Sequence, residues 1–445
     1  MARTHVSLQR ALRHDRVLPL VMNEAAQFKQ LNTLIKDILS AREKTRRSGS
    51  AERVNVAWPV YDEKEVMGAL EALLELRISQ GPRVKQFEQN FAHYIGKKYA
   101  IAVNSGSSAN LLALGALLQA GKLKKGDEVI IPATTFATVA SPVLQLGLIP
   151  VYIDVEENSW NLDPREVEKA ISKKTKAIMV VHTFGNPADM TALKHIAKQH
   201  KLVLIEDCCE AHGARLGKRK VGSFGDVSTL SFFVAHNITT GEGGMIFTDD
   251  RALYDILLSM REFGRFTKNV GRFDYRDPVL GKYDTRYIFT RLGYNVRMTD
   301  IAAALGLAQL KKLDVLNAKR IRIVNAYQKG LTPYTKYLRL PWVRQDGFHS
   351  FYGFPFVVEK GAPFTRMELV QFLEANGIET RPFFGGSLPD QPAFRTEPKR
   401  VIGKLPVARY LRDNAIFIGC HSELGPAQVA HVITTFRDFF KTKGL

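Results

Sequence analysis

The stretch STLSFFVAHNITTGEGG, residues 228–244, is the key to the fold of this chain. Its apolar run from Leu230 to Ala235 leads into a single His236, and a glycine-rich turn follows at residues 241–244. An apolar run that ends in such a turn predicts a strand whose end delivers side chains to a cleft. His236 is therefore a candidate functional residue, although a lone histidine beside an apolar run is more often structural.

Further strand ends carry candidate residues. Residues 202–205 predict a short buried strand that ends in Glu206 and Asp207, and the chain continues as Cys-Cys-Glu-Ala-His-Gly-Ala through residue 214. Another strand, at 128–132, is followed by Phe136, and an aromatic ring at this place can lie flat on a planar ligand or pack in the core.

A strand at residues 100–103 leads into Asn-Ser-Gly-Ser-Ser-Ala-Asn at 104–110 and a helical run at 111–118. Free backbone N–H groups, hydroxyl donors and the positive end of the helix converge at such a place. The pattern therefore indicates an anion site, and an ordinary helix cap explains it equally well. Strands alternate with helices through residue 250, which predicts an α/β fold with a largely parallel sheet and a site at the carboxyl ends of its strands.

Composition narrows the class of protein. The chain has 445 residues, of which 45% are hydrophobic, enough for one large and one smaller domain. No stretch approaches the roughly 18 apolar residues of a membrane helix, and we expect no signal peptide. Three cysteines cannot make a disulfide framework, so we expect a cytoplasmic protein. The net charge of +19 could indicate nucleic acid, but no nucleic-acid motif accompanies it, and a phosphate-bearing cofactor and substrate explain it better.

The motifs together resemble the DegT/DnrJ/EryC1/StrS aminotransferase family of pyridoxal-phosphate (PLP) enzymes, from Trp58 to about residue 440. The resemblance implies fold type I, as in aspartate aminotransferase, with a mostly parallel central sheet and a smaller C-terminal α+β domain. We expect a basic arm with an amphipathic helix at 1–50, a large cofactor-binding α/β domain at 51–317 and the small domain at 318–445. The arm could pack on a partner subunit or be a solvated surface helix.

The resemblance also assigns roles to residues. It places Asp207 at the pyridine nitrogen, Phe136 on the ring face, and Glu210 beside the ring hydroxyl, where a first-turn helix acid is the alternative. In this assignment the cofactor phosphate is bound by Gly106, Ser107 and Ser231, and by Asn295 of the other subunit of a homodimer. For Asn295, a plain helix start capped at Thr299 is the alternative. Residues 263–288 predict a loop over the site.

The family normally has a lysine at position 236, which forms a Schiff base with the cofactor. Histidine cannot do so, and the resemblance is therefore closest to the branch of nucleotide-4-keto-6-deoxyhexose 3-dehydratases. There the pyridoxamine form (PMP) is held without a covalent bond, and His236, with an ordinary pKa of about 6.5, is the expected base. The resemblance implies loss of the hydroxyl at sugar C3 and recovery of PMP from glutamate. A GDP-linked 4-keto-6-deoxymannose is the expected substrate.

One relative in this branch carries a [2Fe–2S] cluster, which needs four thiolates. Cys209 fits the first position of its cysteine pattern, but the later positions fall on Thr267, Asn269 and Asp277. We therefore expect no iron–sulfur cluster and no metal site. Two other functions stay open, namely a sugar aminotransferase that uses another lysine and a PLP-fold binding or regulatory protein.

Overall fold

The computed structural model describes residues 24–48, 53–266 and 287–445, and its internal contacts separate two compact units, residues 1–49 and 50–445. In the first unit, helix α2 (Glu24–Ser48) covers the predicted amphipathic helix and extends beyond it. Its packing against a partner subunit stays a prediction. Most of the predicted loop at 263–288 lies outside the described residues.

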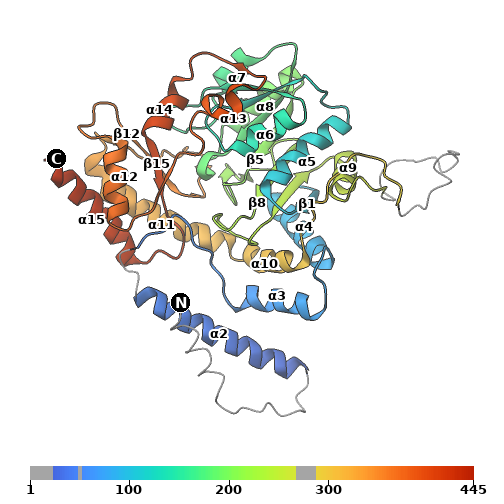
Figure 1. The fold of residues 1–445 in the computed structure, drawn as a ribbon, viewed down its shortest axis with the longest axis horizontal. Helices are drawn as coiled ribbons and strands as arrows, with labels where there is room; N and C mark the ends of the chain where they lie inside the picture. Colours follow the sequence, from blue (N-terminus) through green and yellow to red (C-terminus); the bar gives the residue numbers. More distant parts are fainter. Residues whose placement is uncertain (1–23, 49–52, 267–286) are drawn as a thin grey trace. The chain divides into compact units, whose positions relative to one another are not determined.

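The second unit is built on an eight-stranded sheet (Figure 1). Among the described strands of this sheet, β9 runs antiparallel to both neighbours, and the other pairs are parallel. This arrangement confirms the predicted α/β fold with a mostly parallel sheet. In spatial order the strands are β1 (Tyr99–Val103), β9 (Gly244–Thr248), β8 (Val227–Ser231), β5 (Val203–Asp207), β4 (Thr175–Val181), β2 (Glu128–Pro132), β3 (Ile149–Ile153) and β14 (Arg400–Val401).

Both faces of this sheet are buried, as is usual for parallel strands covered by helices on each side. Successive residues of β2 alternate between two cores, with Val129 and Ile131 in one and Ile130 in the other. The first core includes side chains of α5 (Gly106–Gln119), α6 (Ala137–Gln145) and α9 (Arg251–Arg261), and the second those of α7 (Pro164–Ala170) and α8 (Met190–His200).

Helices α3 (Glu63–Leu74) and α4 (Pro82–Ile95) both contact α10 (Asp300–Leu310). Asp300 is fully buried and accepts hydrogen bonds from the N–H groups of Arg83 (3.3 Å) and Val84 (2.9 Å) in the first turn of α4. Its neighbour Thr299 caps α10 with its side chain. One acidic residue thereby joins two helix starts that are distant in the sequence.

A smaller antiparallel sheet lies in the C-terminal part of the chain, in the order β10 (Leu338–Arg339), β12 (Phe354–Val358), β15 (Ala415–Ile418) and β13 (Thr380–Pro382). Helices α11 (Leu313–Leu331), α12 (Arg366–Ala375) and α15 (Pro426–Thr442) share its core. The predicted boundary at residue 318 stays a prediction, since β14, from the predicted small domain, pairs with β3 of the large sheet. The remaining elements include α14 (Pro406–Asn414), α13 (Pro392–Arg395) and a three-stranded sheet of β11 (Gly347–Phe348), β6 (Arg215–Leu216) and β7 (Arg219–Lys220).

The strand before His236 was predicted in the wrong place. Strand β8 ends at Ser231, and the apolar run to Ala235 lies beyond it, with Phe233 44% and Val234 39% exposed. The paired register with β9 ends where Ser231 faces Gly244, and Gly244 approaches the carbonyl of Ser105 so closely that a Cβ would lie 2.2 Å from its oxygen. The apolar run therefore forms a turn that leads into the site. None of the described helices is both long and apolar enough to cross a membrane.

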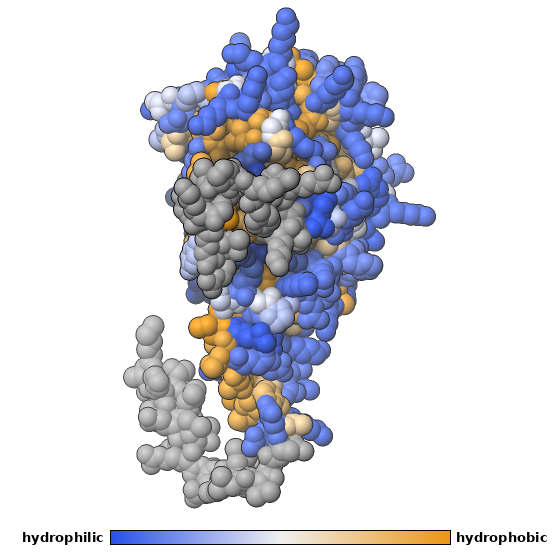
Figure 2. All heavy atoms as spheres, turned by 90° about the vertical axis from the view of Figure 1, so that its right-hand side faces the viewer, coloured by the Kyte–Doolittle hydropathy of each residue, from blue (hydrophilic) through white to orange (hydrophobic). Residues whose placement is uncertain are grey.

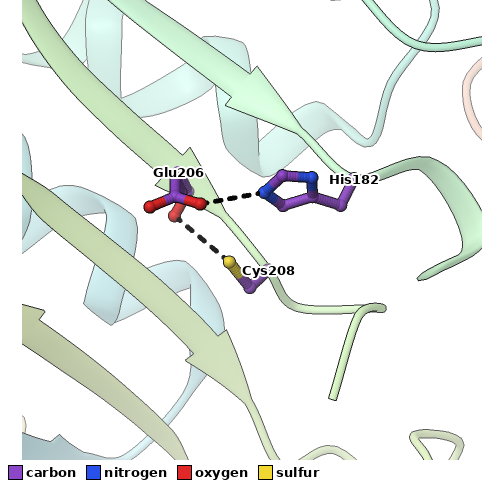
Figure 3. Close-up of side chains that lie close together, drawn as sticks. All are labelled: His182, Glu206 and Cys208. Carbon is purple, nitrogen blue, oxygen red and sulfur yellow. Dashed lines mark hydrogen bonds and ion pairs between the residues drawn. The ribbon is translucent and has the colours of Figure 1, made fainter. Parts of the chain in front are cut away.

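Glu206, the penultimate residue of β5, is fully buried and anchors the turn at 222–225. Figure 3 shows its carboxylate beside the ring of His182. Its carboxylate accepts hydrogen bonds from the N–H groups of Gly222 (2.8 Å), Phe224 (2.7 Å) and Gly225 (2.6 Å), and it lies 3.2 Å from Nε2 of His182. Burial opposes ionisation of Glu206, but the hydrogen bonds from His182 and the backbone outweigh it, so its pKa is lowered.

We predict that Glu206→Gln lowers the free energy of unfolding by about 3 kcal/mol, since an amide has a single acceptor oxygen for three N–H groups. Glu168→Gln, at an exposed residue, is the matched control and should change it by less than about 0.5 kcal/mol. Because the folded-state pKa of Glu206 is lowered, its stabilisation is present above the unfolded-state pKa of about 4.3 and is lost as the pH falls further. Denaturant unfolding at pH 7 and pH 4 measures the free energy of unfolding of each variant and its dependence on pH. An equal loss of this free energy in Glu206→Gln and Glu168→Gln would contradict the role of Glu206.

Candidate active site

The predicted site residues come from strand ends at one edge of the large sheet. Strands β1, β2, β5 and β8 run in the same direction, so their carboxyl ends meet there. Each is followed by one of the predicted segments, namely 105–110 after β1, Phe136 after β2, 207–210 at the end of β5 and 231–236 at the end of β8. The topology thus gathers four motifs that are far apart in the sequence.

Asp207 is a buried carboxylate held in a fixed orientation. Its Oδ2 accepts a hydrogen bond from Nδ2 of Asn110 (2.8 Å), and its Oδ1 accepts one from the N–H of Cys209 (3.0 Å). Asn110 is itself oriented, because its Oδ1 accepts a hydrogen bond from the hydroxyl of Thr229 (2.7 Å) in β8. A carboxylate with this support can hold a positive or protonated group of a ligand in one place.

The start of α5 has the form of an anion cradle. Ser105 caps the helix through the N–H of Ser108 (3.1 Å), and the N–H groups of Gly106 and Ser107, at the first two helical positions, lie ahead of the helical hydrogen-bond ladder. A Cβ on Gly106 would lie 2.5 Å from Cβ and 3.0 Å from Oγ of Ser231, so only glycine brings the helix start this close to β8. Gly106 and Ser231 are buried and Ser107 is exposed, which leaves space for a phosphate on the outer side.

A cavity of about 450 Å³ opens on the same edge. Phe136 is 59% exposed, as expected of a ring that faces an open space rather than the core. The cavity is lined by Val56, Ala57, Phe136, Glu210, Phe233, Ala235, Tyr352, Glu379, Arg381, Pro382, Phe384 and Phe417. The cavity thus brings Phe136 and Glu210 together with Phe233 and Ala235, which lie in the turn that leads to His236.

Glu210 lies in this wall as a carboxyl group with little to stabilise its charge. Burial raises its pKa well above the usual range, Asp207 raises it further, and the N–H of Phe184, 3.0 Å away, only partly offsets these effects. This raised pKa favours the protonated carboxyl group, the form that can donate a hydrogen bond. Phe184 has a φ of 53°, a strained value for a bulky residue, and this conformation aims its N–H at the carboxyl group.

His236 is enclosed by aromatic rings. Its ring centroid lies 5.3 Å from that of Tyr352 and 5.5 Å from that of His212, and its Nδ1 is buried without a hydrogen bond. Burial lowers its pKa well below the usual value, and His212 and Arg320 lower it further. The pKa of His236 is thus lowered from the ordinary value that the sequence suggested, which favours the neutral imidazole, the form that accepts a proton, over a wider pH range.

Asn295 is exposed, and its Oδ1 accepts a hydrogen bond from Nε of Arg297 (3.2 Å). It is not among the residues that line the cavity, and neither are Asp207 and Ser231. Contact with a cofactor of another subunit therefore stays a prediction for this residue.

Several site residues were missed in the sequence. Asn110 follows Gly106 by four residues and so lies on the same face of α5, a spacing from which its approach to Asp207 could have been expected. Tyr352 and Arg320 lie more than 80 residues after His236 and have no local motif. Arg320 is 3% exposed and donates hydrogen bonds to the carbonyls of Phe351 (3.3 Å) and Tyr352 (3.0 Å), which fixes Tyr352 beside His236.

Ligand atoms of His182, Glu206 and Cys208 lie within 4.8 Å of one another, as a metal site would require (Figure 3). Nδ1 of His182 accepts a hydrogen bond from the N–H of Ala188 (3.1 Å), which assigns the ring proton to Nε2 and directs it at Glu206. Burial raises the pKa of Cys208 well above its usual value, so the thiol keeps its proton. We interpret the three residues as a structural hydrogen-bond network.

Known proteins resemble this chain over most of its length. A curated relative, the dTDP-4-dehydro-2,6-dideoxy-D-glucose 3-dehydratase of Saccharopolyspora spinosa, is 38% identical over 393 residues, which are 85% of this chain and 85% of the relative. The solved structure of E. coli GDP-4-keto-6-deoxy-D-mannose-3-dehydratase with bound hydrated PLP has a TM-score of 0.79 and 32% identity, and the match covers 86% of this chain and 99% of that one.

A further structure, a GDP-4-keto-6-deoxymannose-3-dehydratase with a trapped PLP-glutamate geminal diamine, has a TM-score of 0.79 and 31% identity, with 86% of this chain and 100% of that chain covered. A model of the DegT/DnrJ/EryC1/StrS aminotransferase family matches residues 60–437. This match spans the large sheet, the smaller antiparallel sheet and most of the site, and the chain therefore belongs to the DegT/DnrJ/EryC1/StrS aminotransferase family.

Proposed function

We propose that the chain is a PLP-dependent nucleotide-sugar 3-dehydratase, which removes the C3 hydroxyl of a nucleotide-linked 4-keto-6-deoxyhexose in 3,6-dideoxysugar synthesis. The observation that carries the proposal is a histidine, His236, at the position where the resemblance expects the family's lysine. Among the described residues that line the cavity there is no lysine to take over a covalent role. A curated relative and a solved structure that resemble this chain are both named 3-dehydratases, which supports the same chemistry.

The donor set fits PLP and its amine form PMP. The phosphate would lie at the start of α5 with Gly106, Ser107 and Ser231, where a Cβ on Gly106 would close the cradle. Asp207 would hold the pyridine nitrogen in its protonated form, Phe136 would cover the ring, and Glu210 would lie beside the ring hydroxyl. When bound as PMP, the cofactor supplies the amine that condenses with the keto group and the electron sink for loss of the hydroxyl.

His236 would act as the base, taking a proton from the C4′ carbon of the bound cofactor. Its neutral imidazole suits this role, and the enclosure by Tyr352 and His212 fixes the ring. In the proposed overall reaction, one 4-keto sugar nucleotide and one glutamate give the 3-deoxy-4-keto sugar nucleotide, 2-oxoglutarate and ammonia. Glutamate as the donor is supported by the relative with a trapped PLP-glutamate species.

The nucleotide is proposed to be GDP, as in GDP-4-keto-6-deoxymannose, on the strength of the GDP-linked name of the structural relatives. A dTDP-linked sugar is the second candidate, since the relative from Saccharopolyspora spinosa is named for one. We further propose a cytoplasmic enzyme without an iron–sulfur cluster. Cys208, Cys209 and Cys420 are free thiols, as expected in a reducing compartment.

A homodimer is proposed from exposed apolar residues near Asn295. Leu292 is 88% exposed, and at the end of α3 Leu76 and Ile78 are 84% and 61% exposed. Figure 2 shows apolar surface gathered in patches among hydrophilic side chains on one face of the molecule. Apolar surface of this kind favours a protein contact, and a second copy of the chain would bring Asn295 to its cofactor phosphate.

We predict that the cofactor binds without a covalent bond to any lysine. Borohydride reduction of the PLP-loaded protein, followed by peptide mass spectrometry, should find no pyridoxyl-lysine, because position 236 holds an imidazole. A stoichiometric pyridoxyl-lysine would instead support an aminotransferase that uses another lysine, and protein that retains no cofactor would support a binding or regulatory role.

Replacement of His236 should separate cofactor binding from catalysis. We expect His236→Asn to retain PMP and to lose C3 dehydration by a factor on the order of 10² to 10⁴, as for loss of a general base. His236→Lys should attach the cofactor covalently and suppress dehydration. The assays are absorbance of the bound cofactor, deoxysugar formation and glutamate-dependent ammonia release, and undiminished dehydration by His236→Asn would assign the proton transfer to another group.

Anaerobically purified protein should contain neither iron nor acid-labile sulfide in stoichiometric amounts, because its three cysteines are too few for a cluster held by four thiolates. Thr267, Asn269 and Asp277, at the other cysteine positions of the cluster-containing relative, lie outside the described residues. Iron and sulfide analysis with a visible spectrum checks this, and about two irons per chain would contradict it.

A further inference from the structure

The cavity wall carries a single ion pair. Three of the described residues that line it would be charged in water at neutral pH, namely Glu210, Glu379 and Arg381. Arg381, on β13, is the cation among these three, and Glu379 is its counter-ion, because the two side chains form an ion pair. Burial raises the pKa of Glu210 well above the usual range, which favours its neutral form.

The two members of the pair are held differently. Glu379 has two partners, since its Oε2 accepts a hydrogen bond from the N–H of Val56 (2.8 Å) while its Oε1 pairs with Nη2 of Arg381. Arg381 also donates from Nη1 to the carbonyl of its neighbour Thr380 (2.9 Å), and its side chain is 52% exposed. Arg381 can thus turn to another anion while Glu379 keeps its bond to Val56.

Arg381 shares the cavity with a neighbour of the proposed base. Tyr352 also lines this cavity, and its ring lies 5.3 Å from that of His236. An anionic group that binds Arg381 would therefore lie near the reacting atoms, with Tyr352 between it and His236.

We propose that Arg381 binds a carboxylate of the amino donor, and that Glu379 occupies the same guanidinium face until the donor arrives. This inference rests on the proposed function, which requires an amino acid as donor. In such a donor the α-carboxylate is attached to the carbon that bears the amine, so it enters the site close to the reacting atoms.

The diphosphate of a sugar nucleotide fits this position less well. It is attached at C1 of the hexose, across the ring from the reacting C4, and is therefore farther from His236. A diphosphate also carries two charges, and the described wall offers one cation. The planar fork of an arginine can bind one carboxylate through two parallel hydrogen bonds, and Arg381 already pairs through Nη2 with one oxygen of Glu379.

The test compares Arg381→Gln with Glu379→Gln, which removes the competing charge but keeps an oxygen for Val56. Calorimetric titration of the PLP-loaded protein with glutarate, a dicarboxylate without an amine, measures binding without reaction. Arg381→Gln should weaken glutarate binding and raise the apparent KM for glutamate, each on the order of 10- to 100-fold. Glu379→Gln should strengthen glutarate binding by about 2- to 5-fold.

The matched control is Arg409→Gln, which breaks a comparable ion pair with Asp390 away from the cavity and should leave glutarate binding unchanged. Single-turnover dehydration by PMP-loaded protein needs no donor, so Arg381→Gln should leave it within about twofold of the wild type. The inference would be overturned if the wild type did not bind glutarate or if Arg381→Gln left glutarate binding unaffected. It would also be overturned if Arg381→Gln weakened binding of the sugar nucleotide but not of glutarate. If the wild-type protein did not dehydrate the sugar nucleotide at all, this result would instead contradict the proposed function.

Discussion

Two adjacent carboxylates at the end of β5 are the constraint on which the rest of the structure depends. Side chains of a strand alternate between its faces, so Glu206 and Asp207 leave the sheet in opposite directions. Glu206 meets the N–H groups of the turn at 222–225, whereas Asp207 meets Asn110 on α5. A shift of β5 by one residue would exchange the two and leave buried charges without donors, which strongly fixes the register of this strand.

The site inherits its geometry from that register. Once Asp207 is fixed, its bond to Asn110 places α5, and the bond from Thr229 to Asn110 ties the same helix to β8. The close approach of Gly106 to Ser231 follows from this arrangement and leaves no room for a side chain. The anion cradle and the carboxylate therefore form one unit, in which a hydrogen-bond chain across β5, α5 and β8 sets the distance between them.

The sequence predicted the parts of the fold that depend on local pattern. Strand β2 lies at the predicted residues 128–132, and the cradle, Phe136 and Asp207 lie at the carboxyl edge, because apolar runs and small-residue turns carry that information. The sequence pattern misplaced the end of β8. The apolar run to Ala235 forms a turn and part of the cavity wall, and not a continuation of the strand. Tyr352 and Arg320 were beyond prediction, because long-range packing alone brings them to His236.

Under the proposed function, the surroundings of His236 would suit a histidine as well as the lysine that the resemblance expects at position 236. Burial, His212 and the buried guanidinium of Arg320 all disfavour a positive charge at position 236. A lysine in such a place would be driven toward its neutral amine, the form that attacks a carbonyl group, and a histidine is driven toward its neutral imidazole, the form that accepts a proton. Under the proposed function, the same electrostatic environment would serve either residue, and the side chain at position 236 would decide whether it attaches a cofactor covalently or accepts a proton as a base.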